Sequence, residues 1–271
     1  MKHVVCFSGG KDSTALGLWA NENLGVPGKD YIPLHEVTKW EAGSHDAYIE
    51  YINQVVFNGA LRFAASKTYP DGFVQLVADR HGVPSVKRRF CTEELKTLPA
   101  IEFCKSLDDE VTIYMGHRRE ESDARALMCG VEFDDRYDAH VRKPLLDWNE
   151  EMVFAIHKKY GVEPNPLYRM GVRRVGCFPC VMVQLRELKA LVQWPEQWAE
   201  IKRRVLMVEA KIGTSFFPPN YIPKRFMTGR TAEGKIFPWG NDVFRYVEKT
   251  TEDQMPMLEQ RSCMSVYNLC E

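Results

Sequence analysis

Short apolar runs alternate with amphipathic stretches along the first part of the chain. Residues 4–7 are apolar and precede a glycine-rich turn, after which apolar side chains in residues 13–23 recur at helical spacing. Residues 31–37 and 47–57 repeat this order of strand and helix, and residues 111–115 form a further strand-like run. Because strands separated by helices favour parallel pairing, we predict an α/β fold with a doubly wound, mostly parallel sheet.

Two later helices carry recognisable end signals. Residues 73–81 have a helical pattern that Gly82 closes. Asp147 stands three residues before Glu150, which is the spacing of a capping box, and Gly161 would end the helix that begins there.

The composition of the chain changes near Pro164, where proline, arginine, glycine and cysteine become frequent. We therefore predict a domain of residues 1–163 and a mainly helical, cysteine-bearing extension of residues 164–271. Its principal helical stretch is expected over residues 185–212, with an interruption at Pro195.

The overall charge limits the classes of partner. The 271 residues carry a formal net charge of −1, which argues against nucleic-acid binding through bulk electrostatics. The basic clusters at residues 173–174 and 202–204, with Trp194 and Trp198 nearby, would suit a nucleic-acid backbone. A packed helix with a basic outer face explains them equally well, so a nucleic-acid substrate stays open.

No run of residues has the length and apolar character of a membrane span, and the N-terminus lacks a signal-peptide pattern. We therefore expect a cytoplasmic protein without a membrane partner. In a reducing compartment eight cysteines do not form a disulfide framework, so close cysteine spacing points to metal or redox chemistry. The sequence does not determine the oligomeric state.

The turn after the first strand is the strongest candidate site. It consists of Ser8, Gly9, Gly10, Lys11, Asp12 and Ser13. Such a loop presents backbone N–H groups, the positive end of a helix dipole, a lysine and two hydroxyls to an anion, and phosphate is the anion expected. The spacing is not that of a Walker A motif, because Val5 stands where that motif needs glycine.

The loop, at its position directly after the first strand, closely resembles the pyrophosphatase loop of the adenine nucleotide alpha-hydrolase superfamily. That superfamily includes phosphoadenosine phosphosulfate reductases and ATP-using sulfurtransferases. Further segments resemble the reductase-like branch in the same order, so that the resemblance covers residues 3–182. These segments are residues 89–96, 116–125, 144–148, 165–168 and 176–180.

The resemblance implies a Rossmann-like fold and a set of site residues. The nucleotide would contact the whole loop together with Lys96, Gly116, Arg118 and Arg125, and Lys11, Asp12, Arg118 and Cys91 would take part in catalysis. Arg118 and Arg125 are seven residues apart, one helical face, and could hold phosphate or sulfate oxygens; ion pairing of these arginines with Glu121 is an equally good interpretation. In place of the family's Asp-Thr-Gly-x-Glu-like segment stand residues 37–41, which puts base or ribose contacts there in doubt.

Cys177 and Cys180 form a Cys-x-x-Cys turn, the usual half-site for Zn²⁺ or an iron–sulfur cluster. We favour Cys263 and Cys270 as the two further ligands. The alternative is a set with Cys91, because related reductases pair the corresponding cysteine with a downstream Cys-x-x-Cys.

The remaining cysteines have simpler interpretations. A free nucleophile on the tail, as in sulfonucleotide reductases, is a competing role for Cys270 and excludes metal ligation by the same thiol. Cys6, Cys104 and Cys129 are expected to be small buried hydrophobic residues.

These features predict an enzyme that binds ATP, with Mg²⁺, or a related adenylate. It would cleave the α-phosphate linkage and couple adenylation to sulfur transfer, or it would reduce a sulfonucleotide. A sulfur-donor protein or a thiol reductant would then be a partner. The alternative is a regulatory protein that binds nucleotide without turnover and has a structural metal site.

Overall fold

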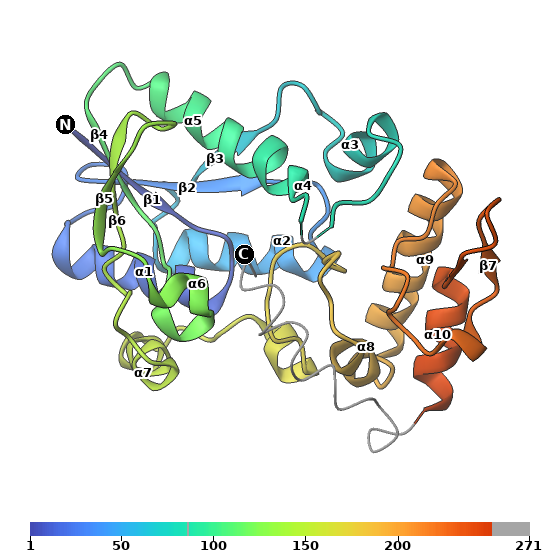
Figure 1. The fold of residues 1–271 in the computed structure, drawn as a ribbon. Coiled ribbons are helices and arrows are strands. Elements are labelled where there is room, and N and C mark those ends of the chain that lie inside the picture. The colour runs from blue at the N-terminus through green and yellow to red at the C-terminus, as the bar shows by residue number, and fades with distance from the viewer. Residues whose placement is uncertain (86, 251–271) are drawn as a thin grey trace.

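The computed structural model describes residues 1–85 and 87–250, and its first part is built on a six-stranded sheet (Figure 1). The strand order is β3-β2-β1-β4-β6-β5, and all neighbours are parallel except β5 and β6. The strands are β1 (Lys2–Cys6), β2 (Ile32–Val37), β3 (Arg62–Ala65), β4 (Val111–Tyr114), β5 (Val131–Asp134) and β6 (Ala139–Arg142). The predicted α/β fold with a mostly parallel sheet is thus confirmed.

Helices cover both faces of the sheet because the central strands are apolar on both sides. In β1, Val5 packs into the core beneath one face and Val4 into the core beneath the other, as the alternation of side chains in a strand requires. The first face is covered by α1 (Lys11–Asn23), α2 (Gly43–Val55) and α7 (Glu150–Tyr160), and the second by α5 (Leu98–Lys105) (Figure 1).

The order of strands identifies the edge at which a ligand is expected. From β1 the chain moves outward to β2 and β3 and then returns to place β4 on the other side of β1. In open α/β sheets ligands bind beyond the carboxyl ends of the strands where the winding direction reverses. The loops after β1 and β4 flank that position.

Residues beyond the sheet form a helical region with a small hairpin, drawn in orange to red in Figure 1. It contains α8 (Leu185–Leu191), α9 (Pro195–Ile212), α10 (Gly240–Lys249) and the antiparallel pair β7 (Gly229–Arg230) and β8 (Ile236–Phe237). Pro195 begins α9 rather than interrupting a longer helix, in agreement with the preference of proline for the first turn.

One core unites this helical region with part of the sheet domain. Trp40, Phe73 and Leu95 belong to the same buried cluster as Leu188 and Val205. The domain boundary between residues 163 and 164 stays a prediction.

Three element ends differ from the sequence expectation. Helix α2 begins at Gly43, four residues earlier than expected, and α3 (Phe73–Asp79) ends before Gly82. The cap of α7 is Asn149, whose side chain accepts a hydrogen bond from the Met152 N–H at 2.9 Å, and not Asp147. Gly161 ends this helix in the left-handed conformation, as predicted.

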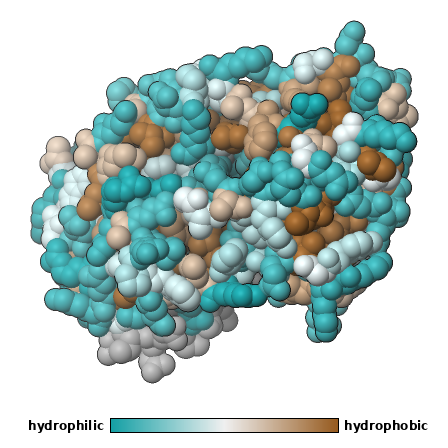
Figure 2. All heavy atoms as spheres, turned by 180° about the vertical axis from the view of Figure 1, so that it is seen from behind, coloured by the Kyte–Doolittle hydropathy of each residue, from teal (hydrophilic) through white to brown (hydrophobic). Residues whose placement is uncertain are grey.

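The surface is mixed in character. On the face drawn in Figure 2, hydrophobic residues lie in separate patches among hydrophilic ones. None of the helices within the described part of the chain is long and apolar enough to cross a bilayer.

Candidate active site

The loop between β1 and α1 requires glycine at position 9. Gly9 has a φ of +76°, and a Cβ atom there would lie 2.3 Å from His45 Cε1. A larger residue would therefore meet both backbone strain and a steric clash. The loop is shaped by this close approach to the fully buried His45.

Gly10 provides no side-chain cap for the first turn of α1, whose N–H groups lack partners within the helix. Distant residues fix its position. The Lys11 N–H donates to the Tyr168 hydroxyl at 2.9 Å, and a ring nitrogen of His157 lies 2.8 Å from the Lys11 carbonyl oxygen. Within the loop, the Ser8 N–H donates to Ser13 Oγ at 3.1 Å.

Charged side chains converge on Asp12. Its carboxylate accepts from Lys11 Nζ at 2.9 Å and from Arg118 Nε at 2.6 Å. Arg118 is 3% exposed and also contacts Glu120 at 2.6 Å. The sequence therefore brings two cations from separate loops to the amino end of α1, a position suited to anionic ligands.

Gly116 allows the loop after β4 to approach this point. A Cβ atom at Gly116 would lie 3.1 Å from the Asp12 carbonyl oxygen, which is tighter than ordinary packing. Its lack of a side chain thus brings the backbone that carries Arg118 against α1.

The helical relation expected between Arg118 and Arg125 is wrong. A 3₁₀ turn (Arg119–Glu121) is followed by an extended Ser122 with φ of −170°, and only then does α6 (Asp123–Ala126) begin. Arg125 is buried and forms an ion pair with Glu121, as the second interpretation of this segment supposed. Burial lowers the pKa of Arg125, with Asp12 opposing the change, whereas for Arg118 burial is outweighed by the carboxylates around it, Asp12 first, which raise the pKa.

A second group of candidate residues lies near the carboxyl end of β2. Cys91 lies in the short helix α4 (Phe90–Thr92), which continues into a π-helix (Glu93–Thr97) carrying Lys96, an irregularity frequent at functional sites. Burial lowers the pKa of Lys96, but the acidic groups around it, with Cys177 first and then Glu36, outweigh burial and raise it.

The three cysteines of this group influence one another. Burial raises the pKa of Cys177 to about 11, while Lys96 opposes the rise. Burial also raises the pKa of Cys91 and of Cys180, and Cys91 interacts with both partners of the Cys-x-x-Cys turn. The half-buried thiols of Cys91, Cys177 and Cys180 therefore lie close enough to influence one another and Lys96.

Residues 38–41, the segment that departs from the family pattern, hold the cysteine turn in place. The Phe178 N–H donates to the Trp40 carbonyl oxygen at 2.7 Å, and the Trp40 indole N–H donates to the Pro179 carbonyl oxygen at 2.9 Å. The Thr38 hydroxyl donates to Glu41 at 2.6 Å and lies 3.6 Å from Cys177 Sγ. This role was missed in the sequence, where only the loss of family residues was visible.

The side chains around the cysteine turn can be compared with those that bind metals in proteins. Three thiols in one neighbourhood match the ligand chemistry of Zn²⁺ and of iron–sulfur clusters. Within residues 1–85 and 87–250, however, no three His, Cys, Asp or Glu side chains are already arranged as a metal site. Cys263 and Cys270 lie outside the described residues.

The other cysteines divide into two kinds. Cys104 is buried and Cys6 is half-buried, and burial raises the pKa of both thiols. Cys129 is exposed, so the expectation that it is a buried hydrophobic residue is wrong. It follows the short helix α6 in a loop where Leu127 is exposed as well.

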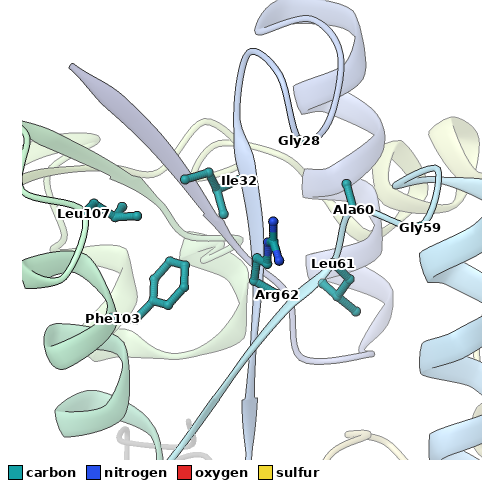
Figure 3. A pocket seen from close by; sticks show the side chains of 8 residues that line it. All are labelled: Gly28, Ile32, Gly59, Ala60, Leu61, Arg62, Phe103 and Leu107. Atoms are coloured by element: carbon teal, nitrogen blue, oxygen red, sulfur yellow. The ribbon is translucent and has the colours of Figure 1, made fainter.

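A cavity of about 450 Å³ lies away from these residues, at the amino ends of β2 and β3 (Figure 3). Its lining includes Ile32 and Arg62, the first residues of those strands, together with Phe103 and Leu107 of the α5 side. Because the loop of residues 8–13 follows the carboxyl end of β1, this cavity and the candidate site lie at opposite edges of the sheet.

Known proteins are similar to this chain over part of their length. An uncharacterised 37.8 kDa protein of Escherichia phage 186 is 38% identical over 167 residues, which are 56% of this chain and 49% of that protein. An adenosine 5'-phosphosulfate reductase of Neisseria meningitidis is 34% identical over 93 residues, covering 34% of this chain and 37% of that protein. The chain thus spans about half or less of the length of these relatives.

Solved structures support the fold. The phosphoadenylyl-sulfate reductase of Candida auris, solved as a phosphate complex, superposes with a TM-score of 0.52 over 66% of this chain and 83% of that chain, at 14% sequence identity. Residues 2–183 match the phosphoadenosine phosphosulfate reductase domain, which includes both loops at the switch point and the cysteine turn. This chain therefore belongs to the phosphoadenosine phosphosulfate reductase domain family.

Proposed function

We propose that this protein is an enzyme that binds an adenine nucleotide at residues 8–13 and couples cleavage at its α-phosphate to sulfur transfer. The observation that carries the proposal is the uncapped amino end of α1, where Lys11 and Arg118 meet at the switch point of the sheet. A family relationship alone would leave the function undecided, because the same fold serves different reactions.

The loop would act on the phosphates through fixed dipoles and charges. Backbone N–H groups near Gly9 and Gly10 would donate to phosphate oxygens, and Lys11 would neutralise charge that develops as the leaving group departs. Lys11 and Arg118 are already held by Asp12, so little reorganisation is needed at the moment of reaction. Mg²⁺ bound with ATP would supply further charge neutralisation.

Asp12 has a positioning role in this proposal. Its carboxylate joins the lysine of one loop to the arginine of another. Arg125 interacts with Asp12 and forms an ion pair with Glu121. It would therefore add a more distant positive charge to the phosphate site.

The cysteine group would supply the sulfur chemistry. We propose Cys91, Cys177 and Cys180 as ligands of an iron–sulfur cluster or Zn²⁺, with one further ligand from the tail cysteines, Cys263 or Cys270. The mutual influence of the three described thiols supports including Cys91, which the sequence ranked second. Tyr168, whose hydroxyl accepts from the Lys11 N–H, stands nine residues before Cys177 in the sequence. The chain between them connects the cysteine group to the nucleotide loop.

Reduction of a sulfonucleotide is the second candidate reaction. It is favoured by the relative from Neisseria meningitidis, which is named an adenosine 5'-phosphosulfate reductase. In that reaction a cysteine thiolate would attack the sulfur of the sulfate group and release the nucleotide, and a thiol reductant would free sulfite.

Product analysis separates the candidates. The protein is incubated with labelled ATP or with phosphoadenosine phosphosulfate, with and without a dithiol. Pyrophosphate release supports adenylation, and sulfite release supports reduction. Binding without either product supports the regulatory alternative and contradicts both reactions.

Replacement of Lys11 tests the binding site itself. Lys11→Ala should weaken adenylate binding by about ten- to a hundredfold, because a charge-assisted contact is worth about 1.5–3 kcal/mol. The exposed Lys29, replaced in Lys29→Ala, is the matched control and should leave the affinity unchanged. Equal affinity of the Lys11→Ala variant and the unmodified protein, measured by calorimetry, would remove the loop from the proposal.

The metal is tested on an anaerobic preparation. An iron–sulfur cluster would give a brown protein with absorbance near about 400 nm, whereas a colourless protein with stoichiometric zinc would exclude the cluster. Cys91→Ser should reduce metal content, and Cys104→Ser, a buried thiol outside the group, serves as the control. Cys263→Ser and Cys270→Ser identify the remaining ligand.

A further inference from the structure

The helical region, residues 164–250, is strongly positive although the whole chain is nearly neutral. Residues 164–250 contain 15 Lys and Arg but only seven Asp and Glu, a net charge of +8, whereas the complete chain has a net charge of −1. Such an asymmetry between parts of one chain is typical of proteins with a polyanionic partner.

Three of the seven acids do not reach the surface, because they bind backbone N–H groups inside the fold. Glu187 accepts from Gln184 and Arg173, Glu209 from Phe216 and Gly240, and Asp242 from Thr228 and Trp239. All three carboxylates are buried. The exposed surface of this region is therefore more positive than its composition alone indicates.

Two of the three cations in the cluster at residues 202–204 are paired. On α9, Lys202 pairs with Glu248 at 3.1 Å, and Arg204 pairs with Glu200 at 2.8 Å while its guanidinium lies over the Trp40 ring. The packed-helix interpretation thus describes these residues well. Six further exposed cations of this region lie elsewhere.

They form a basic surface on the short 3₁₀ turn Lys224–Phe226, the β7–β8 hairpin and α10. Its members are all exposed: Lys224, Arg225, Arg230, Lys235, Arg245 and Lys249. Among residues 1–85 and 87–250, the carboxylate that pairs with a member of this surface is that of Asp242, 3.5 Å from Arg245.

Contacts between these segments make the surface continuous. The Phe226 and Tyr246 rings pack with centroids 5.0 Å apart, and the Thr228 N–H donates to Asp242 at 2.9 Å. These contacts fix the start of β7 against α10, where Figure 1 also shows the two elements side by side.

Half-buried aromatic rings accompany the cations. The Arg225 guanidinium lies 5.0 Å from the centre of the Phe226 ring, and Phe237 packs edge-on against Trp239 at 5.0 Å. Cations that follow a phosphate backbone, combined with rings on which bases can stack, are the features by which proteins hold single-stranded nucleic acid.

We propose that this basic surface binds a single-stranded nucleic acid through its sugar–phosphate backbone and unpaired bases. The proposal does not depend on the reaction at the nucleotide loop, since none of its residues belongs to that site. It gives the chain a second ligand whose source, DNA or RNA, the experiment distinguishes.

The test is fluorescence anisotropy of the full chain with a labelled 20-nucleotide DNA strand, the RNA of the same sequence, and the DNA duplex, over a range of KCl concentrations. The triple variant Arg225→Ala, Arg230→Ala, Arg245→Ala should bind single strands at least tenfold more weakly. The slope of log affinity against log salt should fall by about 2, because each lost phosphate contact removes about 0.7.

Two further variants control for net charge and folding. Lys29→Ala, Arg62→Ala, Lys105→Ala removes the same charge from exposed positions in the sheet domain and should leave binding unchanged. The Arg→Lys triple at 225, 230 and 245 keeps the charge and should retain most of the affinity. Tighter binding of the DNA strand or of the RNA identifies the source of the ligand.

The proposal is overturned if no strand binds at low salt, if both alanine triples weaken binding equally, or if the duplex binds as tightly as the single strands. A Trp239→Ala variant adds an independent readout, since loss of a stacking ring should weaken single-strand binding by about fivefold or more without changing the salt slope.

Discussion

At the scale of single residues, the candidate site contains polar side chains that are partly or fully buried. His45 is fully buried beside Gly9, and His117 stands between Gly116 and Arg118. Burial, and then His35, lowers the pKa of His45 to about 4; burial, and then Arg125, lowers that of His117 to about 3. Both imidazoles are therefore neutral at pH 7, which leaves Lys11 and the arginines as the cations near the loop.

These two histidines predict a pH dependence of stability. Between about pH 4 and 6.5 the unfolded chain binds protons that the folded chain does not, so the free energy of unfolding falls as pH falls through this window. Each histidine should cost about 1.5 kcal/mol between pH 6.5 and pH 5, because the slope reaches about 1.4 kcal/mol per pH unit only once the unfolded imidazole is mostly protonated. Urea unfolding at a series of pH values measures the loss.

Substitutions assign the effect. His45→Asn and His117→Asn should each reduce the pH slope by about one proton in this window, and the double variant by about two. A slope that is unchanged in both single variants would mean that the acid sensitivity comes from other groups. Neither histidine could be recognised from the sequence, because their burial depends on contacts with residues far along the chain.

At the scale of elements, α7 shows how tertiary structure selects among local signals. Asp147 and Asn149 both have side chains that cap helices well, and the sequence favoured Asp147 because of its spacing to Glu150. In the structure Asp147 turns outward to Arg119, and Asn149 takes the cap. The backbone after β6 thus decides a choice that the local pattern left open.

A matched pair of substitutions tests this assignment. Asn149→Ala should reduce the free energy of unfolding by about 1 kcal/mol, as expected for loss of a helix cap. Asp147→Ala removes an ion pair at a side chain that is 80% exposed and should cost less than about 0.5 kcal/mol. Thermal unfolding of both variants measures the difference, and a larger loss for Asp147→Ala would return the cap to the residue that the sequence favoured.

The strands that the sequence predicted differ from the missed ones in position and burial. The strands β1, β2 and β4 are central, buried on both faces and apolar, so their runs were clear. The missed strands β3 and β5 lie at the sheet edges with mostly exposed side chains, and β6 has exposed residues at alternate positions. The loop of residues 8–13 was accessible because all its determinants are contiguous, whereas the approach of Cys91 to Cys177 depends on how α4 and the π-helix fold back.

At the scale of the whole molecule, the sheet domain and the helical region differ in charge but share a core. The sheet side contributes Trp40, Phe73 and Leu95 to that core, and the helical side contributes Leu188 and Val205. Trp40 joins the two in a second way, since its backbone and indole both bind the cysteine turn. The sequence suggested separable units because composition changes at Pro164, but composition does not show which apolar faces meet.

This shared core predicts that residues 1–163 do not fold as an independent unit. Removing residues 164–271 would expose the rings of Trp40 and Phe73, which are each 2% exposed in the complete chain. It would also remove Tyr168 from the Lys11 N–H, so the nucleotide loop would lose one of its fixed contacts. The fragment should bind a hydrophobic dye strongly and unfold without a cooperative transition, whereas residues 1–250 should unfold in one transition by fluorescence and circular dichroism. If the fragment instead unfolds cooperatively and binds adenylate as well as the complete chain, then the boundary at residue 163 separates true domains, and the burial of Trp40 is a contact between them rather than a condition of folding.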